Sequence, residues 1–82
     1  MTKDEIFQTI SNHTKEVVYE LQDQDIKITD SLKELGANSI DRAEILTMTM
    51  ESVDLDVPRV ELFGAKNISD LVDIFHEKKS NN

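Results

Sequence analysis

The sequence predicts an all-α protein, a four-helix bundle with three longer helices and one short one. Three observations favour this fold class. Apolar residues recur at helical spacings of three, four and seven along three segments. Each of those segments begins at a residue that commonly caps a helix N-terminus. The 82 residues also include only two Gly and one Pro, too few for a chain built from loops and turns. We expect one domain over residues 1–79 and a frayed tail over residues 80–82.

The first helix is predicted over residues 3–21. Thr2 and Glu5 have the spacing of a capping box, in which each side chain accepts a hydrogen bond from the backbone N–H of the other residue. Thr14 fills a gap in the apolar stripe that follows. The residues of that stripe are Ile6, Phe7, Ile10, Val17, Val18 and Leu21. Since they share one helical face, we expect them to form part of the core.

Residues 22–38 are predicted to form an extended loop. Ile26 and Ile28 alternate with charged residues, but no second strand-like segment exists to pair with them, so we expect the two Ile side chains to pin a loop. One short turn should follow, capped by Thr29 or Asp30. Gly36 should end that turn, because glycine readily adopts the positive φ found there.

The second long helix should begin at Asn38, a preferred N-cap, with Asp41 at the N3 position. Its inner stripe is predicted to contain Ala43, Leu46, Met50 and Val53, which we expect Ile45 and Met48 to widen.

A short third helix is predicted after Pro58, which suits the first turn of a helix. Its apolar residues are Val60, Leu62 and Phe63, and Gly64 should end it. The last helix should begin at the N-cap Asn67, with Asp70 at N3. Its apolar stripe contains Ile68, Leu71, Val72 and Phe75, and Lys78 and Lys79 lie in its last turn, where cations are favoured.

Composition excludes several functions. Nine Lys and Arg stand against seventeen Asp and Glu, a formal net charge of −8. Such a chain is repelled by nucleic acid and anionic membranes, so we expect neither as a partner. It has no Cys, which fits a cytoplasmic protein without disulfides or thiolate metal sites. No apolar run approaches the length of a membrane helix. Nothing in the sequence indicates oligomerisation, so we expect a monomer.

Catalysis and metal binding are not expected. The chain has only two His, His13 and His76, and both fall on or beside polar faces, where we expect them to be solvated. We therefore expect neither to act as the base of a nucleophilic serine. A calcium loop starting at Asp23 would have Lys27 and Ile28 where an oxygen ligand and Gly are needed. We therefore predict no enzyme and no metal site, with a calcium sensor as a distant alternative.

Ser39 is the strongest candidate for a functional residue. It follows Gly36 and a short loop, and it occupies the first position of the predicted second helix. Free N–H groups and the helix dipole would stabilise a phosphate attached there. These local features alone do not distinguish an attachment site from an ordinary serine beside a helix cap.

The run Gly36-Ala37-Asn38-Ser39-Ile40-Asp41, with the flanking Leu32, Leu35 and Glu44, resembles the attachment motif of acyl carrier proteins. The resemblance covers nearly the whole chain. It implies that a separate transferase joins Ser39 to 4′-phosphopantetheine from coenzyme A, whose thiol then carries an acyl group as a thioester. Asp30-Ser31-Leu32 reproduces the central tripeptide of the motif more closely. We still choose Ser39, because Gly36 follows Ser31 too soon for a long helix to begin there.

The resemblance also implies a partner-docking surface on the second helix. It would contain Asn38, Ile40, Asp41, Ala43, Glu44, Thr47, Met48 and Glu51. Asn38 replaces the usual Asp, which in this family helps to hold Mg²⁺ when the transferase docks. An amide oxygen is a weaker ligand than a carboxylate for such a hard cation.

Arg42 also sits among the acidic residues of this surface, and Met48 and Met50 replace some of the acidity that the resemblance implies. Together with Asn38, these departures favour a specialised, free-standing carrier. The chain resembles the discrete carriers of bacterial polyketide pathways, particularly those that supply a malonyl-derived acetyl unit for β-branching. The implied partners are a phosphopantetheinyl transferase, an acyltransferase, and ketosynthase-like or hydroxymethylglutaryl-synthase-like enzymes. The alternatives are a carrier of fatty acyl or aminoacyl groups and, in another class, an unmodified acidic helical module that binds a basic partner.

Overall fold

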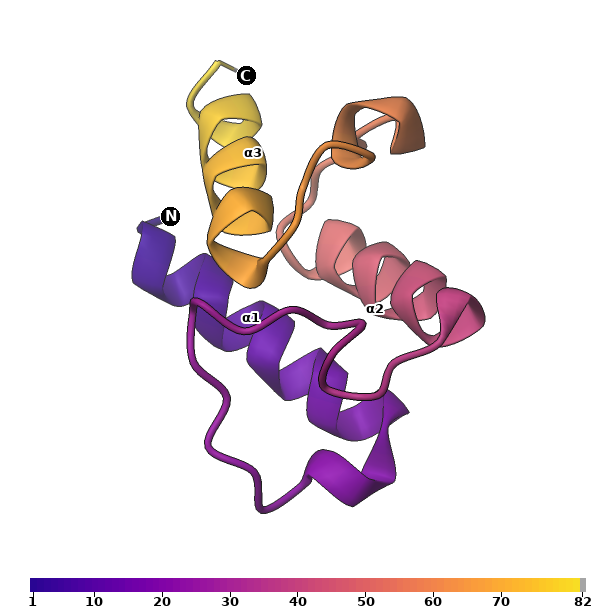
Figure 1. Ribbon diagram of the computed structural model, residues 1–82. Helices are drawn as coiled ribbons and strands as arrows, with labels where there is room; N and C mark the ends of the chain where they lie inside the picture. The colour runs from indigo at the N-terminus through magenta and orange to yellow at the C-terminus, as the bar shows by residue number, and fades with distance from the viewer. Residues whose placement is uncertain (82) are drawn as a thin grey trace.

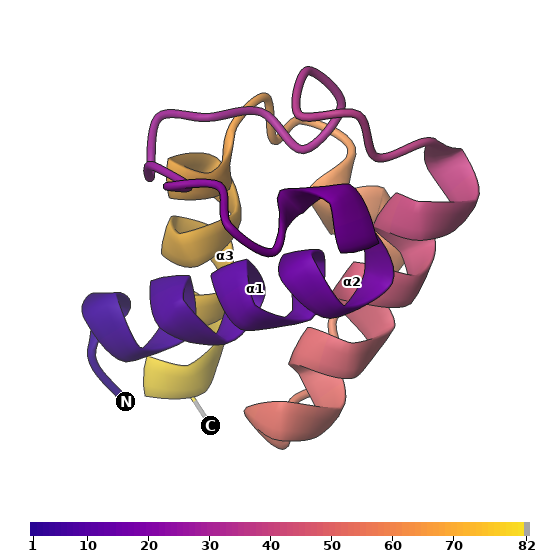
Figure 2. The same cartoon turned by 90° about the horizontal axis from the view of Figure 1, so that it is seen from below.

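The computed structural model describes residues 1–81. Three α-helices and two short 3₁₀ turns follow one another in the order α1 (Lys3–Val17), η1 (Tyr19–Leu21), α2 (Ser39–Ser52), η2 (Arg59–Leu62) and α3 (Ile68–Ser80). Both α2 and α3 pack against α1, whereas the backbones of α2 and α3 stay apart (Figures 1 and 2). Residues 1–81 contain no β-strand, and none of their helices is long and apolar enough to cross a membrane. The all-α prediction is confirmed.

All three α-helices begin at the predicted N-caps, and each has a capping box, which was predicted from the sequence only for Thr2. At α1 the Glu5 carboxylate accepts the Thr2 N–H at 2.9 Å, and the Thr2 hydroxyl accepts the Glu5 N–H at 3.1 Å. The Thr2 backbone bond, with the Thr2 side chain, holds the pKa of Glu5 below its usual value. The pairs Asn38–Asp41 and Asn67–Asp70 repeat this arrangement, so local sequence determines where each helix begins.

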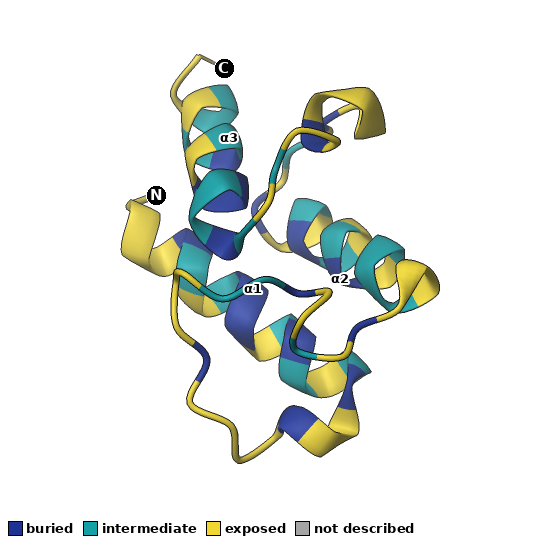
Figure 3. Ribbon diagram, viewed as in Figure 1, coloured by how far each residue is buried: buried dark blue, intermediate teal, exposed yellow. Residues whose placement is uncertain are grey.

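The core lies where α1 meets α3 and the inner face of α2 (Figure 3). Its fully buried apolar residues come from all three helices and from the segment before η2. They are Ile6, Ile10, Ile45, Val57, Ile68, Val72 and Phe75. Thr14 is fully buried in the gap of the α1 stripe, where its hydroxyl donates to the Ile10 carbonyl at 2.7 Å. That bond satisfies the hydroxyl inside an apolar environment.

The prediction that the first helix reaches residue 21 was wrong. The α-helix ends at Val17, Val18 adopts an extended backbone with φ −107° and ψ 90°, and η1 follows as a 3₁₀ turn. Two consecutive β-branched residues weaken the helix at this point. Both Val18 and Leu21 are still buried, so their packing was predicted correctly although the helix was not.

The buried face of α2 is rotated from the prediction. Ile45 and Thr49 are fully buried and Val53 nearly so, whereas Ala43, Leu46 and Met50 are only half-buried. The Thr49 hydroxyl donates to the Ile45 carbonyl at 2.8 Å, which lets a polar side chain face the core. Leu46 and Met50 are left on the flank of the helix.

The predicted fourth α-helix is not confirmed. The segment after Pro58 forms only the 3₁₀ turn η2. Leu62 is its single buried side chain, while Val60 is 69% and Phe63 80% exposed. One buried residue cannot stabilise a longer amphipathic helix, because most of the stability of a short helix in a protein comes from packing.

The loop over residues 22–38 is held in place partly by hydrogen bonds of its backbone. Ile26 is buried as predicted, but Ile28 is 38% exposed. The carbonyls of Ile28 and Asp30 instead accept the N–H groups of Ser69 and Ile68, at 2.8 and 2.9 Å. These bonds attach the loop to the start of α3.

The turn that follows in this loop is capped by neither predicted residue. The Ser31 hydroxyl accepts the Glu34 N–H at 3.4 Å, in place of the predicted Thr29 or Asp30. Gly36 ends the turn with φ 109°, as predicted. At the C-terminus α3 continues to Ser80, and the last residue of the predicted frayed tail lies outside the described residues.

Candidate functional site

Ser39 lies at the junction between the loop and α2, and it is the first residue of that helix. The Asn38 side-chain oxygen accepts the Asp41 N–H at 2.8 Å, and the Asp41 carboxylate accepts the Asn38 N–H at 3.2 Å. The capping box therefore holds the backbone on both sides of Ser39. Ser39 itself is exposed, and its hydroxyl makes no hydrogen bond with any described residue.

The first turn of α2 can stabilise an anion on that hydroxyl. The first N–H groups of an α-helix have no intrahelical partner. The capping box takes up that of Asp41, and those of Ser39 and Ile40 remain unpaired among residues 1–81. A phosphodiester on Ser39 would sit at the positive end of the helix dipole beside these donors. The residues present thus fit a phosphate-linked prosthetic group.

Ser31 occupies a different environment. It is half-buried in the loop, and its hydroxyl accepts the Glu34 N–H. The turn that follows ends at Gly36, so Ser31 does not begin an α-helix. Only Ser39 combines an exposed hydroxyl with a helix N-terminus.

The predicted docking residues all lie on α2 or at its N-cap, and most are accessible. Ile40 is a large apolar side chain that is 76% exposed. Asn38, Glu44, Thr47 and Glu51 are also exposed, while Asp41, Ala43 and Met48 are half-buried. Two of these polar groups are engaged within the chain. The Asp41 carboxylate caps the helix, and the Thr47 hydroxyl donates to the Ala43 carbonyl at 2.9 Å.

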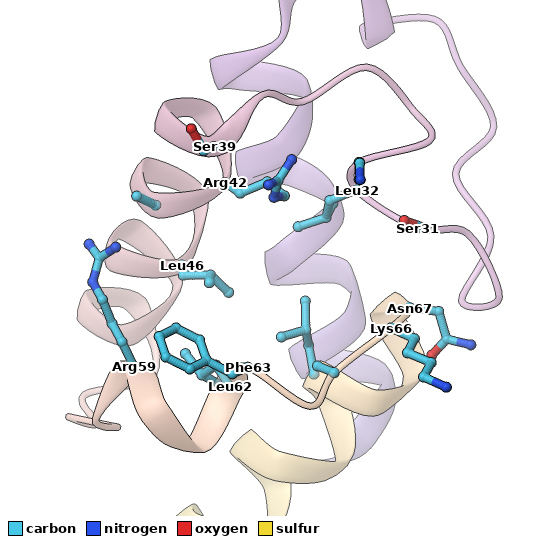
Figure 4. A pocket seen from close by; sticks show the side chains of 14 residues that line it. Ser31, Leu32, Ser39, Arg42, Leu46, Arg59, Leu62, Phe63, Lys66 and Asn67 are labelled. Atoms are coloured by element: carbon cyan, nitrogen blue, oxygen red, sulfur yellow. The ribbon is translucent and has the colours of Figure 1, made fainter.

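A cavity of about 500 Å³ adjoins Ser39 (Figure 4). It lies between the loop, α2, η2 and the start of α3, where the backbones of α2 and α3 stay apart. The residues that line it are Ser31, Leu32, Lys33, Ser39, Arg42, Ala43, Leu46, Arg59, Leu62, Phe63, Ala65, Lys66, Asn67 and Leu71.

The charge of this cavity is not predicted by the sequence. Lys33, Arg42, Arg59 and Lys66 line it, and no Asp or Glu does. These four cations come from four different segments of the chain, so no local motif brings them together. The sequence contained no signal that would have found them.

The prediction that both His are solvated was wrong for His13. His13 Nε2 lies 2.7 Å from the Ser52 hydroxyl, and His13 Nδ1 lies 3.1 Å from a Glu16 carboxylate oxygen. The His13 side chain is only 16% exposed, and His76 is half-buried. The bond between His13 and Ser52 joins α1 to α2 across 39 positions of the sequence.

This Ser–His–Glu arrangement lacks the rest of a hydrolytic site. Ser52 is the last residue of α2, where unpaired carbonyl groups rather than N–H groups are found. A tetrahedral oxyanion needs N–H or other donors aimed at it, and carbonyl oxygens would repel it. We therefore interpret the three residues as a contact that holds α1 and α2 together. Residues 1–81 also contain no group of three or more His, Asp or Glu arranged to hold a metal ion.

Comparison with known proteins places the chain in a family. Residues 8–75 match the model of the family described as a phosphopantetheine attachment site. The chain is 44% identical over 78 residues to the polyketide biosynthesis acyl-carrier-protein AcpK of Bacillus subtilis (strain 168), and the alignment covers 95% of each.

A solved structure is similar along nearly the whole chain. It is a chain of the crystal structure of the curacin biosynthetic pathway HMG synthase in complex with acetyl donor-ACP, with a TM-score of 0.89 and 47% identity. The match covers 95% of this chain and 100% of that one. This protein therefore belongs to the phosphopantetheine-attachment family of acyl carrier proteins, which hold 4′-phosphopantetheine covalently and are carriers rather than catalysts.

Proposed function

We propose that residues 1–79 form a carrier domain in which Ser39 bears the 4′-phosphopantetheine group. The observation that carries this assignment is the exposed Ser39 hydroxyl at the first position of α2, free of any partner among the described residues. The capping box on either side of it keeps the junction ordered, so a transferase meets a preformed helix N-terminus. The group, once attached, supplies the thiol that this Cys-free chain lacks.

We propose further that the carrier serves polyketide synthesis and delivers a malonyl-derived acetyl unit for β-branching. Two relatives support this role, namely an acyl carrier protein of polyketide biosynthesis and an acetyl donor-ACP in complex with an HMG synthase. Both similarities extend over 95% of this chain. The partners would be a phosphopantetheinyl transferase, an acyltransferase, and ketosynthase-like and hydroxymethylglutaryl-synthase-like enzymes.

The residues of α2 would meet these partners. Ile40 offers an exposed apolar contact beside Ser39, and Glu44 and Glu51 offer exposed carboxylates for basic partner surfaces. Such carboxylates mainly raise association rates, and salt weakens their effect. Contacts of this kind suit a protein that must bind and leave several enzymes in turn.

Asn38 should affect how fast the transferase modifies Ser39 when Mg²⁺ is limiting. Its one side-chain oxygen already accepts the Asp41 N–H, so a Mg²⁺ bound there would share that oxygen with the helix cap. We expect Asn38→Asp to accelerate modification of Ser39 at limiting Mg²⁺, because a carboxylate has a second oxygen available for a hard cation.

The assignment of Ser39 is tested by mass spectrometry. The protein is incubated with coenzyme A, Mg²⁺ and a broad-specificity phosphopantetheinyl transferase, and the intact mass is measured. We expect a gain of one phosphopantetheine in the natural sequence and in Ser31→Ala, and none in Ser39→Ala. A gain that survives Ser39→Ala but is lost in Ser31→Ala would reassign the site.

The alternatives predict other outcomes. An unmodified interaction module would show no mass gain with any transferase. A fatty acyl or aminoacyl carrier would be modified, but would reject malonyl groups from candidate acyltransferases and accept a long acyl chain or an amino acid instead. Loading with malonyl, followed by transfer of acetyl to a hydroxymethylglutaryl-synthase-like enzyme, would support the β-branching role.

A further inference from the structure

Arg42 occupies an unusual place for a cation. It is the fourth residue of α2, and a positive charge there faces the positive end of the helix dipole. It forms no ion pair with any residue of the described part of the chain. The side chain is nevertheless half-buried and not extended into solvent. What holds it in place is therefore an uncharged group of the protein.

That group is the carbonyl of Ala37, in the loop before the helix. One guanidinium nitrogen of Arg42 donates to it at 2.7 Å. Figure 4 shows the Arg42 side chain extending from α2 toward Leu32 of the loop, and not toward Ser39. No other hydrogen bond to the Ala37 carbonyl is present within residues 1–81, and Ala37 is only 2% exposed. Without the guanidinium, the carbonyl of a buried residue would lack a protein partner, which is unfavourable.

The bond acts on the peptide unit that directly precedes the N-cap of α2. This unit contains the carbonyl of Ala37 and the N–H of Asn38, which lie in one plane. Arg42 donates to the carbonyl, and the Asp41 carboxylate accepts the N–H at 3.2 Å. Two neighbouring side chains of α2 thus hold both polar groups of the same peptide. With both groups bound the plane is fixed, whereas one bond alone would allow it to turn.

The orientation of this peptide determines how Ser39 is presented, because Ser39 follows Asn38 directly. On the other side of the peptide the chain turns at Gly36, whose φ is 109°. A glycine allows the backbone to take several directions at this point. The capping box fixes the helix side of the junction, and Arg42 attaches the loop side to it.

We infer that Arg42 is a positioning residue for the modification of Ser39, acting through the Ala37 carbonyl and not through the reacting groups. The inference rests on the proposed attachment at Ser39. In that reaction the Ser39 oxygen forms a bond to phosphorus, the adenosine bisphosphate part of coenzyme A leaves, and the transferase accepts the hydroxyl proton. A fixed junction presents the oxygen in one orientation. A loose junction would present it correctly for only part of the time, which lowers the apparent affinity for the transferase by that fraction.

The first measurement uses the free apo carrier. Hydrogen exchange followed by NMR reports how often the Asn38 N–H leaves the Asp41 carboxylate. We expect Arg42→Ala to raise the exchange rate at Asn38 about three- to tenfold, the factor that loss of one hydrogen bond supplies. The exchange rate at Val72, which is fully buried on α3, should stay unchanged and so confirm that the variant is folded.

The second measurement is the rate of modification. The kcat and KM of a broad-specificity phosphopantetheinyl transferase are determined with saturating coenzyme A and varied carrier. We expect Arg42→Ala to raise KM by about the same factor as the exchange rate at Asn38. The value of kcat should change little, because the docked carrier reaches the same geometry.

Two further variants separate the hydrogen bond from the charge. Arg42→Lys should recover part of both losses, since an ammonium group can also donate to the Ala37 carbonyl. Arg59→Ala is the matched control. Arg59 lines the same cavity, but its side chain forms no hydrogen bond or ion pair within residues 1–81. We expect its loss to change neither the exchange rate at Asn38 nor KM.

Each outcome decides one question. No mass gain in the natural sequence would refute the attachment itself. Faster exchange at Asn38 with an unchanged KM would limit Arg42 to a structural role, which overturns the inference and leaves the carrier function standing. A raised KM with unchanged exchange, or an equal effect of Arg59→Ala, would assign the effect to charge contact with the transferase and would also overturn it.

Discussion

The side of the molecule where α1 meets α3 and the side around η2 are packed very differently. Ile6, Ile10, Val72 and Phe75 are fully buried on the first side. Within η2 on the second side only Leu62 is buried, and the adjacent Phe63 is 80% exposed beside an open cavity.

This difference separates stability from function within one small bundle. The apolar side chains that are 0% exposed come from α1 and α3, with the exception of Ile45, so the most completely buried part of the core lies on the α1–α3 side. The η2 side is held by few side chains. It can therefore adjust to the phosphopantetheine arm and its acyl group with little cost in stability. Ser39 and the cationic cavity are both found on this loosely packed side.

Phe75→Ala should have the largest effect, because it removes a fully buried aromatic side chain from the packed side. We expect a loss of about 3–5 kcal/mol in the free energy of unfolding. That is a large part of the stability of a small domain. Urea denaturation followed by circular dichroism measures it. A loss below about 1 kcal/mol would mean that the two sides do not differ as described.

Leu62→Ala should come next. It removes the only buried side chain of η2, which is 6% exposed. We expect a loss of about 2 kcal/mol, the lower end for a buried leucine, because the adjoining cavity lets the site collapse. The same denaturation experiment tests this value. A loss equal to that of Phe75→Ala would show that η2 is as important to stability as the packed side.

Ser52→Ala should weaken the contact between α1 and α2. It removes the hydroxyl that lies 2.7 Å from His13 Nε2, and we expect a loss of about 1 kcal/mol. Ser80→Ala is the matched control. Ser80 is also the exposed last residue of a helix, but its hydroxyl bonds only the His76 carbonyl of the same helix. Equal losses in the two variants would contradict a tertiary role for Ser52.

Phe63→Ala should change stability by less than about 0.5 kcal/mol, although it removes the same side chain as Phe75→Ala. The reason is that Phe63 is already 80% exposed in the folded state. The melting temperature of the Phe63→Ala variant should therefore match that of the natural sequence. A clear fall would indicate that Phe63 folds back over the cavity in solution.

The smallest effect concerns Glu5 at the start of α1. Its pKa is lowered because the carboxylate accepts the Thr2 N–H in the folded state. A lowered pKa means that the bond adds stability at pH values above the usual pKa of 4.5, and that this stability is lost as pH falls through the lowered value. NMR titration of the Glu5 carboxyl carbon measures the shift. Thr2→Gly should retain the backbone bond and most of the shift, since the backbone bond is the larger cause.

The sequence predicted best those features that depend on residues three or four positions apart. The N-caps Thr2, Asn38 and Asn67 were all predicted correctly, and each forms a capping box with the third residue after it. The stripe of α3 was also predicted correctly, and of the stripe predicted for the first helix Ile6 and Ile10 are buried on α1. The stripe of α2 was not predicted correctly, because adjacent apolar residues such as Ile45 and Leu46 allow two buried faces, and the helix buries Thr49.

The sequence by itself determined the fold class, the helix starts and the exposed serine at the head of α2, because each rests on interactions within one helical turn. Only the tertiary structure decided that His13 meets Ser52, that the segment after Pro58 stays a 3₁₀ turn, and that four cations surround one cavity. These features join residues far apart in the chain. Their positions depend on how the helices pack, and a local pattern contains no record of that packing.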